Sequence, residues 1–247
     1  MTSFVFPEAR FASGYSVRTD KNVIYARDTP LLVFGSGEKT VLFAHGNSSA
    51  IGDHVPIAVD MAATFGCRVV LYEYPGYGGA AGRPSPAGLN AAALNAYRFA
   101  RREFDGQVYG MSHSLGCGPT SSLGRVEESG GIDGIALFAP FCSTRQIGRD
   151  WAGMLTDAID WPDWDVAGNV ASVASKVLFV HGELDELIPF RHSSRLFAAA
   201  KAPWRRLSID PIGTHLYLTT NWLDEFLGVS KPVSFRYGIG QQLNFVI

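Results

Sequence analysis

The chain is poor in the features that mark several protein classes. It has three cysteines in 247 residues, Cys67, Cys117 and Cys142, and none of them falls in a C-x-x-C spacing. An odd number at such spacings does not fit a disulfide framework or a cysteine-based zinc site. The cysteine content therefore favours a reducing compartment, and we expect a cytoplasmic protein.

Membrane and nucleic-acid signals are also missing. No run of about 18 apolar residues occurs, and the N-terminus lacks a basic segment followed by the apolar stretch of a signal peptide. We therefore expect neither export nor integral membrane association. Acidic residues, 23 in number, slightly outnumber the 21 basic ones, which gives a net charge of -2. Nucleic acid is not an expected partner, because its binding normally requires a basic patch.

Short apolar runs that end at glycine, proline or polar turns recur along the chain. They are continuous rather than alternating, which is typical of strands buried on both faces of a parallel sheet. The runs are VLFAHG (41–46), RVVLYEYPG (68–76), QVYGM (107–111), GIALFAP (134–140) and KVLFVHGE (176–183). A last strand is predicted over RRLSIDP (205–211).

Helical patterns lie between these strands. Apolar residues spaced by three, four and seven predict a helix over 87–104, and further helices are predicted over 191–201 and 217–227. Alternating strands and helices indicate an α/β fold with a mostly parallel central sheet covered by helices on both faces. Residues 11–35 are expected to add antiparallel strands at one edge.

No repeat or low-complexity linker divides the chain, so residues 1–247 are predicted to form a single domain. One insertion interrupts the alternation, at about 142–169, and it is rich in tryptophan and aspartate. We interpret it as a short helical cap over the ends of the strands. The tail from Gly228 to Ile247 is apolar enough to dock on the body or on another subunit.

Residues with complementary chemistry follow three of the predicted strands. Ser112 and Ser114 follow the third run, Asp185 lies after the fifth, and His215 follows the last. In open α/β sheets the carboxyl ends of the strands carry the reactive groups. A serine hydroxyl needs an imidazole to take its proton and a carboxylate to orient that imidazole. His215 and Asp185 are predicted to have those two roles.

Each of these two residues has competitors in the sequence. Glu183 and Glu186 flank Asp185, whose position within HGELDEL favours it. His192 is a rival base, but it lies on the next predicted helix and is expected to face solvent or to pack. His215 is therefore the predicted base.

The first loop adds a means of stabilising negative charge. His45, Gly46 and Asn47 follow the strand VLFA directly, and glycine is expected to let the backbone turn so that the Asn47 amide points toward the nucleophile. With the amide of the residue after the nucleophile, Leu115 if Ser114 attacks, it would form an oxyanion hole.

The stretch VYGMSHSLGCGP leaves two candidate nucleophiles. A nucleophile on a strained turn requires small residues two positions before and after it. Ser112 is framed by Gly110 and Ser114, and Ser114 by Ser112 and Gly116, so the pattern alone does not choose. Pro119 favours Ser114, because proline costs little in the first turn of the following helix. Ser112 stays as the alternative nucleophile.

Taken together, AHGNSS, YPGYGGAAGRPS, SHSLGCGPT, HGELDELIPF and GTH resemble the α/β-hydrolase superfamily. The chain looks most like its small serine hydrolases, in the branch that includes protein depalmitoylases and serine aminopeptidase-like enzymes. The resemblance implies an α/β-hydrolase fold, a nucleophile at Ser114 within H-S-L-G, and no cofactor or metal. It implies a small acyl ester or thioester as substrate.

The sequence departs from the family pattern at several positions. Gly79 or Ala80 stands where the family loop usually has serine, and Glu73 where aspartate or asparagine is common. The N-terminal cysteine cluster of membrane-bound depalmitoylases is absent, so membrane-anchored depalmitoylation is not implied.

The expected function is therefore a serine esterase or thioesterase, with two alternatives. One is an aminopeptidase or amidase, for which cap aspartates would have to anchor the substrate amine. The other is a non-catalytic binding protein of the same fold. In the cap, five residues are candidate substrate contacts: Trp151, Met154, Leu155, Trp161 and Trp164.

Overall fold

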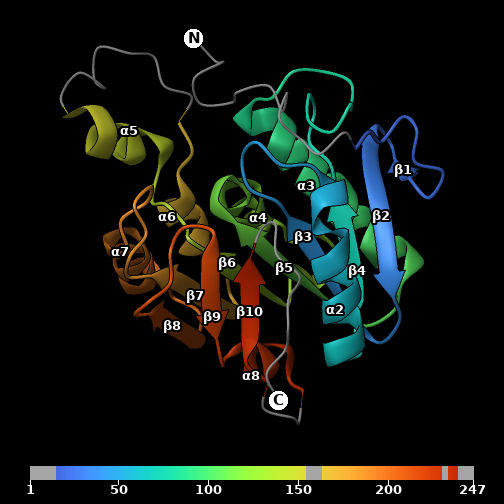
Figure 1. Cartoon of the computed structure of the whole chain (residues 1–247). Coiled ribbons are helices and arrows are strands. Elements are labelled where there is room, and N and C mark those ends of the chain that lie inside the picture. Colours follow the sequence, from blue (N-terminus) through green and yellow to red (C-terminus); the bar gives the residue numbers. More distant parts are fainter. Residues whose placement is uncertain (1–14, 154–162, 230–232, 239–247) are drawn as a thin grey trace.

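The computed structural model describes residues 15–153, 163–229 and 233–238. Its centre is an eight-stranded sheet with the strand order β1-β2-β4-β3-β5-β6-β7-β8 (Figure 1). The strands are β1 (Ile24–Ala26), β2 (Thr29–Gly35), β3 (Lys39–Ala44), β4 (Arg68–Tyr72), β5 (Gln107–His113), β6 (Gly134–Phe138), β7 (Lys176–Gly182) and β8 (Trp204–Asp210). From β4 to β8 all neighbours are parallel, and β1 and β2 form an antiparallel edge.

Helices cover both faces of this sheet. They are α2 (Val55–Phe65), α3 (Pro86–Glu103), α4 (Cys117–Ser122), α5 (Thr144–Ala152), α6 (Val166–Val170), α7 (Arg191–Ala199) and α8 (Leu223–Leu227). The core on one face includes apolar side chains of α3, α4, α6 and α7. On the other face the core includes side chains of α2 and α8. These two layers confirm the α/β architecture expected from the sequence.

Every continuous apolar run singled out in the sequence is a strand of the central sheet. The residues of β6 are all buried, as are all but the first residue of β4 and β7. The helix predicted over 87–104 is α3, which begins after Ser85, whose hydroxyl accepts from the Gly88 amide. The helix predicted over 191–201 is α7.

The helix predicted over 217–227 is wrong in its first half. Residues Tyr217–Thr220 form strand β9, and only Leu223–Leu227 are helical. β9 pairs antiparallel with β10 (Phe235–Gly238), and this pairing with a distant segment outweighs the local apolar spacing. Helix α2 was not expected from the sequence.

Strand β10 also shows where part of the C-terminal tail lies. Phe235 and Tyr237 are buried in the same core as α2 and α8. The described part of the tail therefore docks on the body of its own chain, in front of the sheet in Figure 1. Residues 239–247 lie outside the described residues.

The insertion between β6 and β7 contains α5 and α6. Figure 1 shows α5 beyond the carboxyl ends of the parallel strands, at the top of the molecule. Within the residues that the structure describes, no helix is both long and apolar enough to span a bilayer.

Candidate active site

Ser114, His215 and Asp185 form a continuous hydrogen-bonded chain at the carboxyl edge of the sheet. Ser114 Oγ lies 2.9 Å from His215 Nε2. His215 Nδ1 lies 2.8 Å from Asp185 Oδ2. Because the carboxylate accepts from Nδ1–H, Nε2 of a neutral imidazole is left free to accept the serine proton. The three loops named from the sequence thus bring their side chains together.

Ser114 occupies a strained turn between β5 and α4. Its φ is 52°, in the left-handed region that costs a non-glycine residue roughly 1–2 kcal/mol. Gly116 makes the turn possible, because a Cβ there would lie 2.4 Å from the carbonyl oxygen of Ala44 on β3. The neighbouring strand β3 therefore requires a small residue at position 116. Pro119 is the third residue of α4.

Ser112 has a different environment. It belongs to β5, is almost completely buried, and its hydroxyl lies 3.5 Å from the Cys117 thiol. Burial raises the pKa of that thiol to about 12, so Cys117 is a packing residue in its neutral form. The serine at position 112 is therefore accommodated beside a small sulfur-containing side chain.

Asp185 is held by its own loop as well as by His215. Its Oδ1 accepts from the amides of Leu187 and Ile188, at 2.9 and 2.8 Å. Burial alone would raise its pKa, but hydrogen bonds from His181 and His215 hold the pKa of this carboxyl well below its usual range. Asp185 is therefore ionised near neutral pH.

The other carboxylates of this loop are oriented differently. Glu183 and Glu186 are exposed, whereas Asp185 is buried. His181 Nε2 lies 3.2 Å from Asp185 Oδ2, so this histidine supports the carboxylate. This contact was not predicted from the sequence, although the i, i+4 spacing of the two residues could have indicated it.

The loop that carries His215 is fixed from two sides. Asp210, at the end of β8, accepts from the amides of Ile212 and Thr219, at 3.2 and 2.8 Å. His113 Nε2 donates to the carbonyl oxygen of His215 at 2.7 Å. Burial, reinforced by the nearby His215, lowers the pKa of His113 to about 3, so His113 stays neutral. The residue that precedes Ser114 thus positions the loop of its partner.

The loop after β3 lies beside the same serine. Gly46 is required for close approach and not for a left-handed turn, because a Cβ there would lie 2.8 Å from His113 Nδ1. The positive φ, 58°, falls instead at Ser48. The Asn47 side chain accepts from the Tyr77 hydroxyl at 2.7 Å, which fixes the residue whose amide was predicted for the oxyanion hole.

A network of buried hydrogen bonds supports the start of this loop. His45 Nε2 lies 2.7 Å from Glu73 Oε1, and the Tyr74 hydroxyl donates to the His45 carbonyl at 2.8 Å. Glu73 also accepts from the amide of Ile51 at 3.0 Å. The glutamate that departs from the family pattern is therefore a fully paired structural residue.

A cavity of about 360 Å³ adjoins the hydrogen-bonded chain. This volume is within the usual range of small-molecule sites. Ser114, His215 and Leu115, which are buried, and the half-buried Asn47 line the part of it that we call its inner end. Its apolar lining residues beyond Leu115 are Phe141, Ile147, Trp151, Leu187, Ile188 and Leu216. Among the described residues that line it, none is Asp, Glu, Lys or Arg.

The predicted substrate contacts of the cap have different outcomes. Trp151 lines the cavity. Trp164 does not: it is a buried core residue whose ring covers Gly118 and whose Nε1 donates to Asn90 Oδ1 at 3.0 Å. The bond of its indole nitrogen is with α3, and the ring does not line the cavity. Met154, Leu155 and Trp161 lie outside the described residues.

Both ring nitrogens of His192, the alternative base, have hydrogen-bond partners. It is buried on α7, Nε2 lies 2.6 Å from Asp150 Oδ2, and Nδ1 accepts from the Cys142 amide. The expectation that it packs is confirmed, and solvent exposure is excluded. In the part of the chain that the structure describes, no group of three or more His, Cys, Asp or Glu side chains is arranged to hold a metal ion.

Comparison with known proteins finds relatives among hydrolases. The chain is 28% identical over 231 residues to lysophosphatidylserine lipase ABHD12 of Bos taurus, covering 80% of this chain and 58% of that protein. It is 27% identical over 179 residues to alpha/beta hydrolase domain-containing protein 17B of Homo sapiens, covering 70% and 59%. The chain thus spans less than two thirds of either relative.

A similar fold occurs among solved structures. Est1E from Butyrivibrio proteoclasticus, with ferulic acid bound, superimposes with a TM-score of 0.62 at 18% identity, over 78% of this chain and 90% of that one. No family model matches the chain. The sheet order, the strained turn after β5 and the superposition show that the chain has the α/β-hydrolase fold, and in sequence it is similar to proteins named as α/β hydrolases.

Proposed function

We propose that the chain is a serine hydrolase that cleaves a carboxylic ester or thioester through an acyl-enzyme. The observation that carries the proposal is the chain of two hydrogen bonds from Ser114 Oγ to His215 Nε2 and from His215 Nδ1 to Asp185 Oδ2. Hydrolase activity is further supported by relatives that are named as lipases and by esterases of the same fold.

In this mechanism Ser114 Oγ attacks the substrate carbonyl carbon while His215 Nε2 takes its proton. The carbonyl oxygen becomes an oxyanion, for which the amides of Leu115 and Asn47 are the proposed donors. When the tetrahedral intermediate collapses, His215 gives the proton to the departing alcohol or thiol, and an ester of Ser114 remains. A water molecule then repeats the attack with His215 as base, which releases the acid and restores the serine.

The role of Asp185 follows from its charge. An ionised carboxylate at Nδ1 holds the imidazole in the productive tautomer and stabilises the imidazolium that forms during each attack. His113 stays neutral beside that imidazolium, because burial keeps its pKa near 3. The site therefore does not place a second positive charge next to His215.

The hypothesis of an esterase or thioesterase is favoured over the alternative of an aminopeptidase or amidase. An anchored amine would require a carboxylate facing the cavity, and no described residue that lines it is Asp or Glu. Asp150 pairs with Arg191 and His192, and Asp165 caps α6 through the Gly168 amide. These two cap aspartates are thus engaged within the protein.

The proposal is tested by comparing Ser114→Ala with Ser112→Ala on p-nitrophenyl esters. Ser114→Ala is expected to lower kcat by about 10⁴-fold or more, whereas Ser112→Ala retains kcat within about threefold. Aminoacyl anilides, assayed in parallel, test the amidase alternative. Ester hydrolysis that persists in Ser114→Ala would refute the assignment of the nucleophile.

A further inference from the structure

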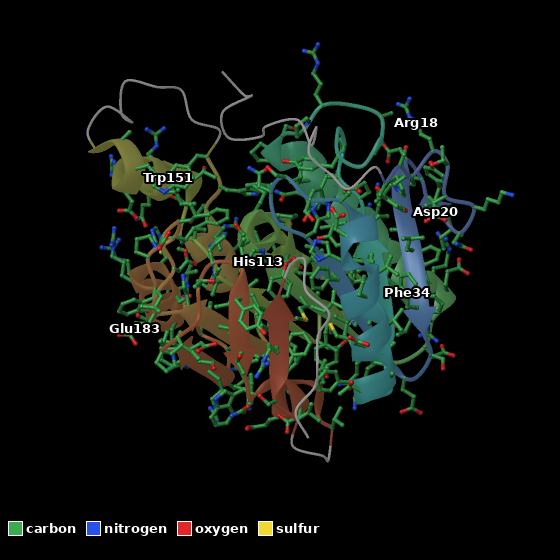
Figure 2. The ribbon with its side chains drawn as sticks, in the orientation of Figure 1. Arg18, Asp20, Phe34, His113, Trp151 and Glu183 are labelled. Carbon is green, nitrogen blue, oxygen red and sulfur yellow. The ribbon has the colours of Figure 1, made fainter. Side chains whose placement is uncertain are left out.

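The outer wall of the cavity comes from two separate segments. Ile147 and Trp151 belong to α5, and Leu187 belongs to the loop between β7 and α7. The Trp151 indole donates from Nε1 to the Leu187 carbonyl at 2.9 Å. Figure 2 shows Trp151 at the outer end of this region and His113, next to the nucleophile, at the centre of the molecule. A substrate must therefore extend outward from Ser114 to contact α5.

Apolar packing holds α5 only weakly. Of its nine residues, Thr144 and Gly148 are buried, and Trp151 is 55% exposed. Polar contacts must therefore contribute to fixing the helix that carries this part of the wall.

The imidazole ring of His192 on α7 bonds to the chain just before α5 and again near the end of α5. At the start, the amide of Cys142 donates to His192 Nδ1 at 3.2 Å. At the end, His192 Nε2 lies 2.6 Å from Asp150 Oδ2. Because Nδ1 accepts, Nε2 carries the proton and donates it to the carboxylate, so the tautomer is fixed. The ring is completely buried, which strengthens both bonds.

Asp150 receives a second, more exposed bond. Arg191 Nη2 donates to its Oδ1 at 2.6 Å, and the Arg191 side chain is half exposed. The two partners of Asp150 therefore differ: the His192 ring is buried and makes a charge-assisted bond, whereas the Arg191 side chain is half exposed and its bond is screened by solvent.

We propose that Asp150 and His192 are positioning residues that hold α5 against α7, next to the β7–α7 loop, and thereby determine the preference of the enzyme for long acyl groups. This inference rests on the proposed esterase or thioesterase function. Short acyl groups occupy the inner end of the cavity and do not need α5. Long ones reach Ile147 and Trp151, whose placement depends on the bonds to His192.

The test measures kcat and KM with p-nitrophenyl acetate and p-nitrophenyl octanoate. Asp150→Ala removes both acceptor atoms and is expected to raise KM for octanoate by about fivefold or more, with kcat and the acetate parameters within about twofold. Asp150→Asn, which keeps one neutral acceptor, should give a smaller shift in the same direction. Trp151→Ala serves as the positive comparison, because it removes the wall residue itself.

Two control variants each remove one charged group of an ion pair at the surface. Arg191→Gln breaks the exposed bond of the same carboxylate, and Glu128→Gln breaks a surface ion pair with Arg98. Both are expected to leave the octanoate-to-acetate ratio within about twofold. If Asp150→Ala fails to fold, Asp150→Asn carries the test.

Equal losses on both esters, or no change on octanoate, would overturn the proposal for Asp150 and His192. Failure of the proposed function has a different signature, since the unmodified protein would then hydrolyse neither ester and would not react with a fluorophosphonate.

Discussion

The inner and outer sides of the cavity are held in place by different means. At the inner side, Ser114 lies on a strained turn against β3, and the His215 loop is bonded to both β8 and the residue before the nucleophile. At the outer side, α5 is exposed over much of its surface and is tied to α7 through His192. The difference indicates that the position of the reacting atoms is built into the sheet, whereas the wall depends on a few side chains.

The largest effect is expected from breaking the inner side at His215. His215→Gln removes the proposed base but keeps a polar side chain of similar size, and kcat/KM should fall by about 10⁴-fold for every ester, whatever its acyl length. Steady-state kinetics with short and long p-nitrophenyl esters measure this. A loss confined to one chain length would contradict the division between the two sides.

The second prediction concerns the pH dependence of stability, to which a buried histidine on each side of the cavity contributes. Burial lowers the pKa of His113 at the inner side and of His192 at the outer side, so each is neutral in the folded protein and protonates more readily once unfolded. Below pH of about 6.5 the unfolded chain binds more protons, and the free energy of unfolding should fall by up to about 1.4 kcal/mol per pH unit for each histidine.

Urea denaturation between about pH 7 and pH 5 measures that slope above the range in which the aspartates of the unfolded chain, Asp185 and Asp150 among them, begin to take up protons. His113→Asn should reduce the slope by up to about one proton, because its pKa of about 3 keeps it neutral over this window. A stability that does not change with pH would show that these histidines are not buried in neutral form.

The smallest of the three effects is expected at Tyr77. Tyr77→Phe removes the hydroxyl that donates to Asn47 Oδ1 at 2.7 Å, so the proposed oxyanion amide is held less firmly. A loss of about 1 kcal/mol corresponds to a fall in kcat of about fivefold. The fall should be equal for acetate and octanoate esters. A change in KM for octanoate alone would place Tyr77 with the outer wall instead.

The sequence predicts the inner side better than the outer side for a physical reason. Buried parallel strands are continuous apolar runs, and the residues that follow them meet at one edge of the sheet. Ser114, Asp185 and His215 could therefore be named from their places after three strands. Resemblance to a known family and the position of Pro119 then favoured Ser114 over Ser112.

The parts that were missed depend on contacts between distant segments. β9 pairs with β10 some distance further along the chain, and no local pattern shows that pairing. Asp150 could not be told apart from the other aspartates of the insertion, because its partner His192 lies 42 positions away. Trp164 was predicted to contact the substrate, but its ring packs on Gly118 in the core and its Nε1 donates to Asn90.

The central claim is that Ser114 is the nucleophile. The most direct measurement is to treat the protein with a fluorophosphonate and to identify the modified residue by peptide mass spectrometry, in the unmodified chain and in Ser112→Ala and Ser114→Ala. We predict a covalent adduct on Ser114 in the first two proteins and none in the third. An adduct on Ser112, or no adduct on a folded unmodified chain, would contradict the claim, and the latter result would favour a non-catalytic binding protein.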